Sequence, residues 1–316
     1  MTTGAETEFA RAVIAGLSQR PRVIPARFLY DKYGSELFEA ITRLSEYYLT
    51  RAEVWLLRAH GPDIAHLSGH GRVLVEFGSG SSAKTPLLLD HVKATAYLPI
   101  DISADYLHAS ASAFAATHPG LDVLPLAADF TKPLSLPAMV AGEPKLGFFP
   151  GSTIGNMTHR AAVTLLRAFR DTLGPGTRLV IGIDTRKDPR LIQAAYNDAA
   201  GLTAAFNLNL LRRINRELEG TIPVRAFRHR AFWNDTLGRT EMHLVTAEDV
   251  AFHAAGHNFH LDAGDSIHTE NSYKYTLEEA RLLARASGWE PLVAWTDPNR
   301  LFALHLWAAE PDRIEP

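Results

Sequence analysis

The sequence contains no cysteine among its 316 residues. Disulfide bonds, zinc–thiolate sites and thiol nucleophiles are therefore excluded. No apolar run reaches the ~18 residues that a membrane-spanning helix needs. The N-terminal segment MTTGAETEFARAVIAG lacks the basic stretch and apolar core of a secretory signal. We therefore expect a cytoplasmic protein that does not bind membranes.

An excess of charge of either sign is also missing, since 32 Lys and Arg residues stand against 35 Asp and Glu residues. This balance provides no general attraction to nucleic acid. Arginines gather between positions 212 and 230, but Glu217 and Glu219 dilute them, so we expect no nucleic-acid partner. With 46% apolar residues the composition is globular. An enzyme or a ligand-binding protein, which we expect to be a monomer, remains.

Repeats and low-complexity linkers are absent, and short apolar runs bounded by Gly, Pro, Asp or Ser dominate the middle of the chain. Continuous apolar runs that alternate with helical stretches predict a parallel sheet covered on both faces. The runs lie at 73–77, 96–100, 123–126, 146–149 and 179–183, and two more at 292–295 and 302–307 complete seven strands.

The α/β rhythm breaks after residue 200, where a helical stretch at 202–217 precedes strand-like runs at 225–233 and 240–246. We predict a doubly wound α/β domain with a seven-stranded sheet, interrupted by an insertion. The predicted domain covers 60–200 and 286–316. The segments 1–59 and 201–285 form a second, discontinuous α+β domain that binds the substrate.

The first predicted strand runs into a glycine-rich loop, Glu76-Phe-Gly78-Ser-Gly80-Ser-Ser-Ala83-Lys84-Thr85. Such a turn into a helix presents backbone N–H groups to a ligand. The loop fits the loose dinucleotide fingerprint, but Ala83 stands where a Walker loop requires glycine. Glu76 before the glycines suits the cationic sulfonium of S-adenosylmethionine better than a pyrophosphate. A glycine turn without a ligand is the fourth reading, because a lone GxG is weak evidence.

Polar residues follow three further strands, and carboxyl ends of parallel strands meet at the ligand edge of the sheet. Asp101 can accept the hydroxyls of an adenosine ribose, which agrees with both NAD and S-adenosylmethionine. Asp129 and Phe130 can hold the edge and face of an adenine, although Asp129 is equally suited to an N-cap. Asn156 follows the fourth strand, where a substrate meets the cofactor; its alternative role is also a helix cap.

Several long motifs resemble the histidine Nα-methyltransferases of ergothioneine biosynthesis. The resemblance extends from about Arg27 to Leu306 and implies a class I methyltransferase fold. It also implies an enzyme that uses S-adenosylmethionine to methylate the α-amino group of L-histidine three times, giving hercynine. The motifs are Phe28-Leu-Tyr30-Asp31, Gly34-Ser-Glu-Leu-Phe38, Glu46-Tyr47-Tyr48-Leu-Thr50-Arg51-Ala-Glu53, Gly151-Ser-Thr-Ile-Gly-Asn156 and Thr269-Glu270-Asn271-Ser272-Tyr-Lys-Tyr275.

The resemblance also implies roles for individual residues. The cofactor residues are Gly78, Lys84, Asp101, Asp129 and Phe130. The substrate residues are Tyr47, Asn156 and Tyr196 for the backbone end of histidine, and Met242, Glu270, Asn271 and Ser272 for its imidazole. Tyr30, with Phe38, lies near the amino group, and Tyr30 and Asn156 are the candidate catalytic residues. Leu49 stands where the family usually has proline, and the lack of that proline would loosen the backbone beside Tyr47.

Other interpretations remain at this stage. A related enzyme could methylate another amino acid, such as tyrosine or tryptophan, but Glu270 and Met242 favour histidine. Taken by spacing alone, Glu270 could be a surface residue of an edge strand. An NAD-dependent oxidoreductase is less favoured, because no residue clearly supports hydride transfer. The three histidines at 253, 257 and 260 have helical spacing, but Gly256 interrupts that helix, so we expect no metal site.

Overall fold

The computed structural model describes residues 7–309, which divide into two compact units. The first unit comprises the residues up to Tyr47 together with Asp188–Ser272, and the second comprises Tyr48–Lys187 and the residues from Tyr273 onward. The sequence expectation placed the boundaries near 59, 200 and 285 instead. Helix α3 (Tyr48–Ser68) packs on the strands of the second unit, so this unit takes in residues 48–59. No helix of the described part is long and apolar enough to cross a membrane.

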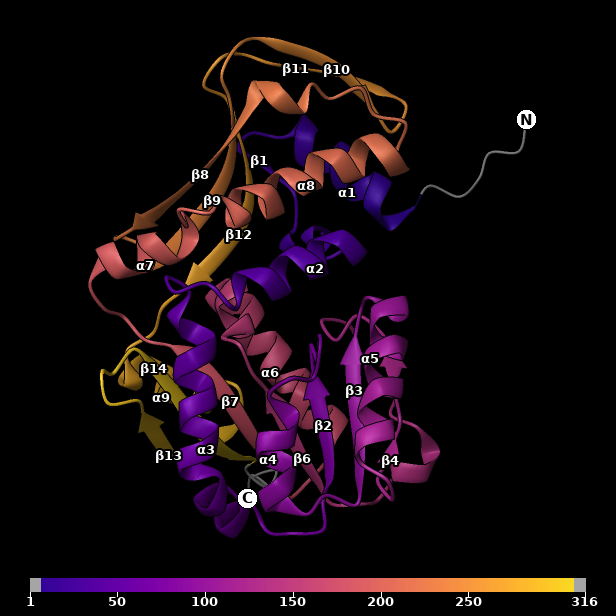
Figure 1. The fold of residues 1–316 in the computed structure, drawn as a ribbon, viewed down its shortest axis with the longest axis vertical. Helices are drawn as coiled ribbons and strands as arrows, with labels where there is room; N and C mark the ends of the chain where they lie inside the picture. Colours follow the sequence, from indigo (N-terminus) through magenta and orange to yellow (C-terminus); the bar gives the residue numbers. More distant parts are fainter. Residues whose placement is uncertain (1–6, 310–316) are drawn as a thin grey trace, which may run out of the picture. The chain divides into compact units, whose positions relative to one another are not determined.

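The second unit is built on one twisted sheet (Figure 1). Its strands run in the order β13-β14-β7-β6-β2-β3-β4, and β5 pairs with the same strand, β3, as β4 does. The central strands are parallel, whereas β14 is antiparallel to both β7 and β13. The strands are β2 (Val73–Phe77), β3 (Ala96–Asp101), β4 (Asp122–Val123), β5 (Leu126–Ala127), β6 (Lys145–Phe149), β7 (Arg178–Asp184), β13 (Trp289–Thr296) and β14 (Phe302–Ala309).

The predicted α/β class is thus confirmed, with one difference in strand count. The run expected at 123–126 is divided into the short strands β4 and β5, which pair with β3 at different places. Leu124 and Pro125 lie between them. Proline carries no N–H for a sheet ladder, so a break at this position is expected on physical grounds.

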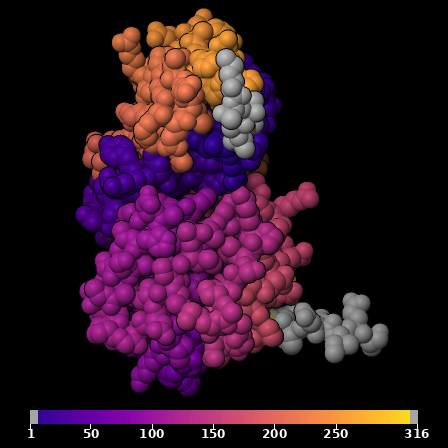
Figure 2. All heavy atoms as spheres, turned by 90° about the vertical axis from the view of Figure 1, so that its right-hand side faces the viewer, coloured from indigo at the N-terminus to yellow at the C-terminus, as the bar shows by residue number. Residues whose placement is uncertain are grey.

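Helices cover both faces of this sheet. Helices α3 and α4 (Thr85–Val92) contact each other on one face, and α6 (His159–Leu173) and α9 (Leu277–Ala286) do so on the other. Helix α5 (Ala104–Thr117) packs on β3 and β4. Figure 2 shows the magenta face of this unit, where α5 exposes most of its side chains. The connecting segments include the 3-10 turns η2 (Ala138–Val140) and η3 (Thr153–Asn156).

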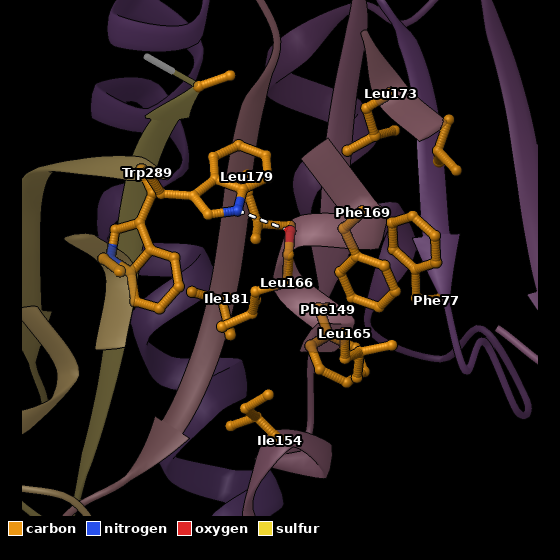
Figure 3. Close-up of a cluster of buried hydrophobic side chains, with 14 of the residues drawn as sticks. Phe77, Phe149, Ile154, Leu165, Leu166, Phe169, Leu173, Leu179, Ile181 and Trp289 are labelled. Carbon is orange, nitrogen blue, oxygen red and sulfur yellow. Dashed lines mark hydrogen bonds between the residues drawn. The ribbon is translucent and has the colours of Figure 1, made fainter. Parts of the chain in front are cut away.

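Apolar side chains between the sheet and helices α6 and α9 form a large core (Figure 3). Phe77 stacks on Phe169 with ring centroids 3.6 Å apart, and Phe149 meets Phe169 edge to face. The indole N–H of Trp289 donates to the carbonyl of Leu166 at 2.9 Å. The buried polar atom of the tryptophan is therefore satisfied within the core.

The first unit combines helices with a sheet in the order β1-β12-β9-β8 and a separate hairpin of β10 and β11. Helix α8 spans the same residues, 202–217, that the sequence predicts. The elements are α1 (Glu8–Ser18), β1 (Arg22–Val23), η1 (Ala26–Leu29), α2 (Lys32–Ile41), α7 (Pro189–Tyr196), α8 (Leu202–Glu217), η4 (Val224–Ala226), β8 (Phe227–Asn234), β9 (Arg239–Thr246), β10 (Val250–Ala254), β11 (His257–Leu261) and β12 (Ser266–Tyr273).

Helix α2 begins after Asp31, whose carboxylate caps the helix by accepting the N–H of Gly34 at 2.8 Å. Asn209 and Arg216 of α8 also donate to the Asp31 carboxylate, at 2.7 and 2.6 Å. Asp31 therefore fastens α2 to α8, which gives a structural reason for an acidic residue next to Tyr30.

Candidate active site

The glycine loop of the second unit follows β2, and its backbone lies close to Phe130 and Asp101. Gly78 and Gly80 have φ angles of +74° and +52°, which glycine adopts without strain. A Cβ at Gly78 would lie 3.3 Å from the ring of Phe130. The carboxylate of Asp101 accepts the N–H groups of Gly80 and Ser103, each at 3.0 Å. Three of the predicted cofactor residues, Gly78, Asp101 and Phe130, thus lie around this one loop.

Glu76 lies under the loop and is almost wholly buried. Its Oε2 accepts the hydroxyl of Thr85 at 2.6 Å and the hydroxyl of Tyr97. Burial raises the pKa of Glu76 to about 7, although both hydrogen bonds and the nearby Lys84 oppose that rise. The carboxyl group therefore titrates near pH 7, where a nearby cation would favour its ionised form.

Phe130 and Asp129 follow the short strand β5. The Phe130 ring packs at 5.7 Å from Phe149 and 6.1 Å from Phe169. Asp129 closes a turn, because its Oδ1 accepts the N–H and hydroxyl of Thr131, at 3.0 and 2.5 Å; no helix begins there. The alternative role as a helix N-cap is therefore wrong. A cavity of about 290 Å³ opens beside Thr131 and is lined further by Met157, Thr158, Arg160, Ala161, Thr164 and Leu165.

Lys84 lies just before helix α4 and its side chain is one-fifth exposed. Its Nζ pairs at 2.5 Å with Oε2 of Glu53, a carboxylate of α3 with no exposed surface. The same carboxylate accepts the N–H of Gly151, at 2.9 and 3.0 Å from its two oxygens. In the sequence, Glu53 is only the last residue of the motif 46–53, and no role was predicted for it.

Asn156 ends η3, in the loop that follows β6, and is half-buried. The next helix, α6, is capped by Thr158, whose hydroxyl oxygen accepts the N–H of Ala161 at 3.3 Å. The cap role is therefore taken by Thr158, and the side chain of Asn156 is not needed for it. Gly155 leaves no room for a Cβ, which would lie 2.8 Å from the carbonyl oxygen of Tyr273.

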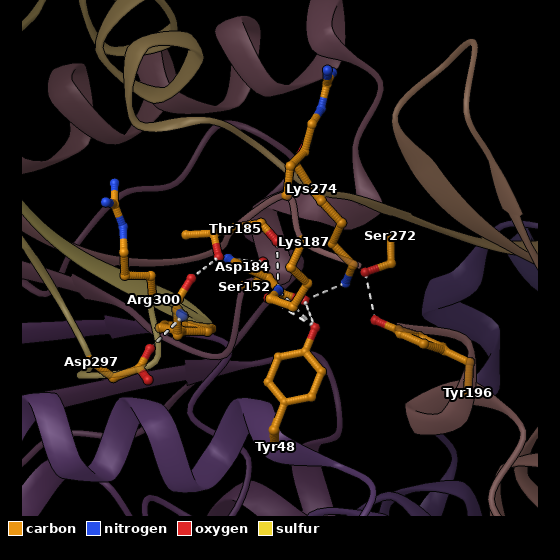
Figure 4. Close-up of polar contacts among 12 residues, drawn as sticks. Tyr48, Ser152, Asp184, Thr185, Lys187, Tyr196, Ser272, Lys274, Asp297 and Arg300 are labelled. Carbon is orange, nitrogen blue, oxygen red and sulfur yellow. Dashed lines mark hydrogen bonds and ion pairs between the residues drawn. The ribbon is translucent and has the colours of Figure 1, made fainter. Parts of the chain in front are cut away.

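A buried charge cluster surrounds Asp184 at the end of β7 (Figure 4). Lys274 and Lys187 pair with its two carboxylate oxygens at 2.6 and 2.5 Å, and the hydroxyl of Tyr48 donates to it at 2.9 Å. Burial would raise the pKa of Asp184, but the two lysines outweigh burial and lower it. Burial lowers the pKa of Lys187 to about 8. The N–H of Asp184 donates to Ser152 Oγ at 2.9 Å and thereby holds the same loop that Glu53 holds.

In the first unit, three predicted substrate residues lie together. The hydroxyl of Tyr196 donates to Ser272 Oγ at 2.6 Å (Figure 4). Glu270 precedes Ser272 by two residues on β12, so the two side chains share a face of the strand. Glu270 is only 9% exposed, and β12 lies between β1 and β9. The alternative of a surface glutamate on an edge strand is therefore wrong.

Met242 and Asn271 also lie in this sheet. Met242 is buried on β9, and its carbonyl accepts the hydroxyl of Thr269 at 3.0 Å. The same hydroxyl approaches Oδ1 of Asn207 from α8 at 2.7 Å. Oδ1 of Asn271 is buried and has no hydrogen-bond partner among the described residues. Asn271 alternates with Glu270 and Ser272 along β12, so this unused acceptor lies on the opposite face of the strand.

The predicted residues Tyr30 and Tyr47 belong to one aromatic group in the first unit. Phe38 connects them, with ring centroids 5.5 Å from Tyr30 and 6.1 Å from Tyr47. Phe206 of α8 completes the group at 5.3 Å from Tyr30 and was not singled out in the sequence. Leu49, the departure from the family pattern, is the second residue of α3 and buried. Proline is tolerated in a first turn, and the helix fixes the Leu49 backbone as proline would.

The three histidines at 253, 257 and 260 lie on the β10–β11 hairpin and not on a helix. Another group, Glu241, His243 and His268, has ligand-type atoms within 4.8 Å of one another. The rings of His243 and His268 stack at 9°, so their lone pairs lie in parallel planes and do not converge. Arg239 and His243 both donate to Glu241; burial would raise the pKa of Glu241, but these bonds lower it to about 2. This geometry is that of a hydrogen-bond network.

The chain is similar to known methyltransferases. Residues 9–309 match the model of a family described as histidine-specific, SAM-dependent methyltransferases. The chain is 39% identical to the histidine N-alpha-methyltransferase of Mycolicibacterium smegmatis, over 94% of this chain and 93% of that protein. It is 31% identical to ergothioneine biosynthesis protein 1 of Neurospora crassa, over 91% of this chain but 33% of that larger protein.

A solved S-adenosylmethionine-dependent methyltransferase from Clostridium acetobutylicum has a similar fold, with a TM-score of 0.50. The match covers 87% of this chain and 99% of that one, at 12% sequence identity. At this identity the likeness concerns the fold alone.

Proposed function

Because this chain belongs to the histidine-specific, S-adenosylmethionine-dependent methyltransferase family, we propose that it methylates the α-amino nitrogen of L-histidine three times, giving hercynine for ergothioneine biosynthesis. The observation that carries the proposal is the buried carboxylate of Glu270 beside the Tyr196–Ser272 hydrogen bond. A buried carboxylate that faces an imidazole N–H forms a charged hydrogen bond worth ~1.5–3 kcal/mol. Apolar amino acids cannot form this charged hydrogen bond and would bind more weakly.

The residues of the second unit fit S-adenosylmethionine. Asp101 offers a carboxylate at the end of β3 for the ribose hydroxyls, and Phe130 offers an aromatic face for the adenine. The cavity is lined by Thr131, the residue that follows Phe130 in the chain. Lys84 retains N–H donors for the carboxylate of S-adenosylmethionine. Glu76, with its pKa raised to about 7, suits the positive charge of the sulfonium nearby. When bound, this cofactor supplies a methyl group on a sulfonium, which is an electrophile.

The residues of this chain then bind, orient and deprotonate the amino acid. In our proposal Asn156, Tyr47 and Tyr196 hold the backbone end, including its carboxylate. Glu270, Ser272 and Met242 hold the imidazole, whereas the predicted contact from Asn271 would have to come from the other face of β12. The amine must lose a proton before it can attack, and Tyr30 is our candidate for the group that accepts it. The aromatic group around Tyr30 excludes water from the amine, which favours its neutral form.

The proposal is tested by incubating the purified protein with S-adenosylmethionine and each of the twenty amino acids, followed by mass spectrometry. Trimethylated histidine is expected as the main product. Unmodified histidine would overturn the proposal, and preferential methylation of tyrosine or tryptophan would replace histidine as the substrate. The cytoplasmic location and monomeric state expected from the sequence stay predictions.

A substitution tests the assignment of the imidazole contact. Glu270→Ala is expected to lower kcat/KM for histidine by about 10- to 100-fold, the equivalent of a charged hydrogen bond, while binding of S-adenosylhomocysteine persists. The matched control is Glu248→Ala, which removes an exposed carboxylate of the same unit and should leave kcat/KM unchanged. If Glu270→Ala methylates histidine as well as the wild type does, the imidazole assignment is wrong.

A further inference from the structure

Glu53 is a fully buried carboxylate with two different partners in the second unit. It pairs with Lys84 Nζ at 2.5 Å and accepts the N–H of Gly151 at 2.9 Å. Lys84 ends the glycine loop at the start of α4, and Gly151 opens the loop that ends at Asn156. One side chain from α3 therefore contacts a predicted cofactor residue and the backbone that carries a predicted substrate residue.

The surrounding structure makes space for this carboxylate. Gly182 of β7 faces Glu53, and a Cβ at position 182 would overlap Oε1 of Glu53. Gly151 and Ser152 both have positive φ angles, +78° and +57°. This conformation aims the Gly151 N–H at the carboxylate, and for Ser152 it is uncommon. The backbone of β7 and that of the loop after β6 are thus both adapted to the position of one carboxylate.

A buried carboxylate is costly unless charged or hydrogen-bonded partners compensate for its lost hydration. Lys84 supplies the charge and Gly151 supplies a backbone donor, so each contact depends on the other through the same group. Lys84 keeps two of its three N–H donors for a ligand, because Glu53 occupies only one. Glu53 thereby restricts a flexible lysine to one position before any ligand binds.

We propose that Glu53 is a positioning residue that joins the cofactor-binding lysine Lys84 to the loop 150–156 that presents Asn156. Through Glu53, the placement of Lys84 and the placement of the substrate loop become interdependent. This inference rests on the proposed function for the part that concerns histidine. Its cofactor part rests only on membership of an S-adenosylmethionine-dependent family.

Glu53→Gln is the sharpest perturbation, because an amide has a single acceptor oxygen where the carboxylate has two. If the glutamine oxygen takes the place of Oε2, it can still accept from both donors, but the negative charge that pairs with Lys84 is lost and the NH₂ group faces the N–H of Gly151 in the place of Oε1. We expect Glu53→Gln to raise the Kd for S-adenosylhomocysteine and the KM for histidine at least tenfold each. Lys84→Met should raise that Kd similarly and raise the histidine KM at least threefold. In the double variant Glu53→Gln/Lys84→Met, the Kd for S-adenosylhomocysteine should rise by a smaller factor than the product of the factors measured for the two single variants.

The control is Asp63→Asn on the same helix, which removes an exposed carboxylate and should change neither constant by more than twofold. Titration calorimetry with S-adenosylhomocysteine and initial-rate kinetics with histidine give the two constants, and circular dichroism gives the melting temperature. A lower melting temperature with both constants unchanged means a purely structural role and overturns the proposal. An effect on the cofactor alone overturns the link to the loop.

If Glu53→Gln does not fold, Lys84→Met decides, since an unchanged histidine KM in that variant also overturns the link. The proposed function is refuted by a different result, namely that the wild-type protein does not methylate histidine. In that case the calorimetric comparison still tests the pairing of Glu53 with Lys84.

Discussion

Glu76 gives a prediction in which stability and ligand binding oppose each other. Its carboxyl group is fully buried at the end of β2, and burial raises its pKa from 4.5 to about 7. Because each pKa unit corresponds to about 1.4 kcal/mol, ionised Glu76 destabilises the native state by about 3 kcal/mol. The folded protein binds the proton more tightly than the unfolded chain, so stability falls as the pH rises from 4.5 through about 7.

Glu76→Gln removes this titration and retains an oxygen for the hydroxyl groups of Thr85 and Tyr97. At pH 5 the variant and the wild type should have similar free energies of unfolding. At pH 8 the variant should be more stable by up to about 3 kcal/mol. Urea denaturation at pH 5, 6, 7 and 8, followed by tryptophan fluorescence and circular dichroism, measures the difference. A difference that does not grow with pH, or one that favours the wild type at pH 8, would refute the reasoning.

Ligand binding should respond in the opposite direction. The ionised carboxylate favours a cation nearby, so at pH 8 Glu76→Gln should weaken S-adenosylmethionine, which has a sulfonium, more than the uncharged thioether S-adenosylhomocysteine. Calorimetry with both ligands gives the ratio of the two affinities. An unchanged ratio would mean that Glu76 supports the fold of the loop and does not sense the charge of the cofactor.

Three further predictions concern the second unit. Asp184→Asn leaves Lys187 and Lys274 buried without their counter-charge and should lower the free energy of unfolding by about 3–5 kcal/mol in urea denaturation; a loss under 1 kcal/mol would contradict this. Lys187 has its pKa lowered from 10.5 to about 8, so the wild type should gain stability as the pH rises from 8 to 10.5. Thermal melts of Lys187→Met should lack that gain. If the melting temperatures of the variant and the wild type change with pH in parallel, the lowered pKa of Lys187 is refuted. Thr276→Ala breaks the reciprocal cap with Glu279 and should cost about 1 kcal/mol, whereas Thr276→Ser should cost less.

The parts of the fold that follow from local pattern were predictable. Residues 73–77 are apolar except for Glu76 and form β2 with those bounds, and the helical period at 202–217 gives α8. Strand β12 was not among the predicted strands because its sequence, SIHTENSY, is almost entirely polar. It therefore lacks the alternation of apolar and polar residues that indicates a strand. The place of Glu270 in the sheet depends on its pairing partners, which no local window contains.

Site residues were predictable where a motif named them, and not where distant contacts define them. Glu53 occupies one position of an otherwise ordinary helix, and nothing within α3 distinguishes a buried glutamate from a solvated one. Its environment comes from Lys84, Gly151 and Gly182, which lie 31, 98 and 129 positions away in sequence. The same holds for Asp184, whose partner Lys274 is ninety positions further along the chain.

Among the described residues of the second unit, the three most deeply buried carboxylates nevertheless share one location. Glu76 is the penultimate residue of β2, Asp184 is the last residue of β7, and Glu53 reaches the loop after β6. All three therefore lie at the carboxyl edge of the parallel strands, where ligands bind in open α/β sheets. Packing alone would favour apolar side chains there, since buried charges are often neutral or costly for stability. Their concentration at this one edge is what a functional site predicts, and a stabilising role alone gives no reason for it.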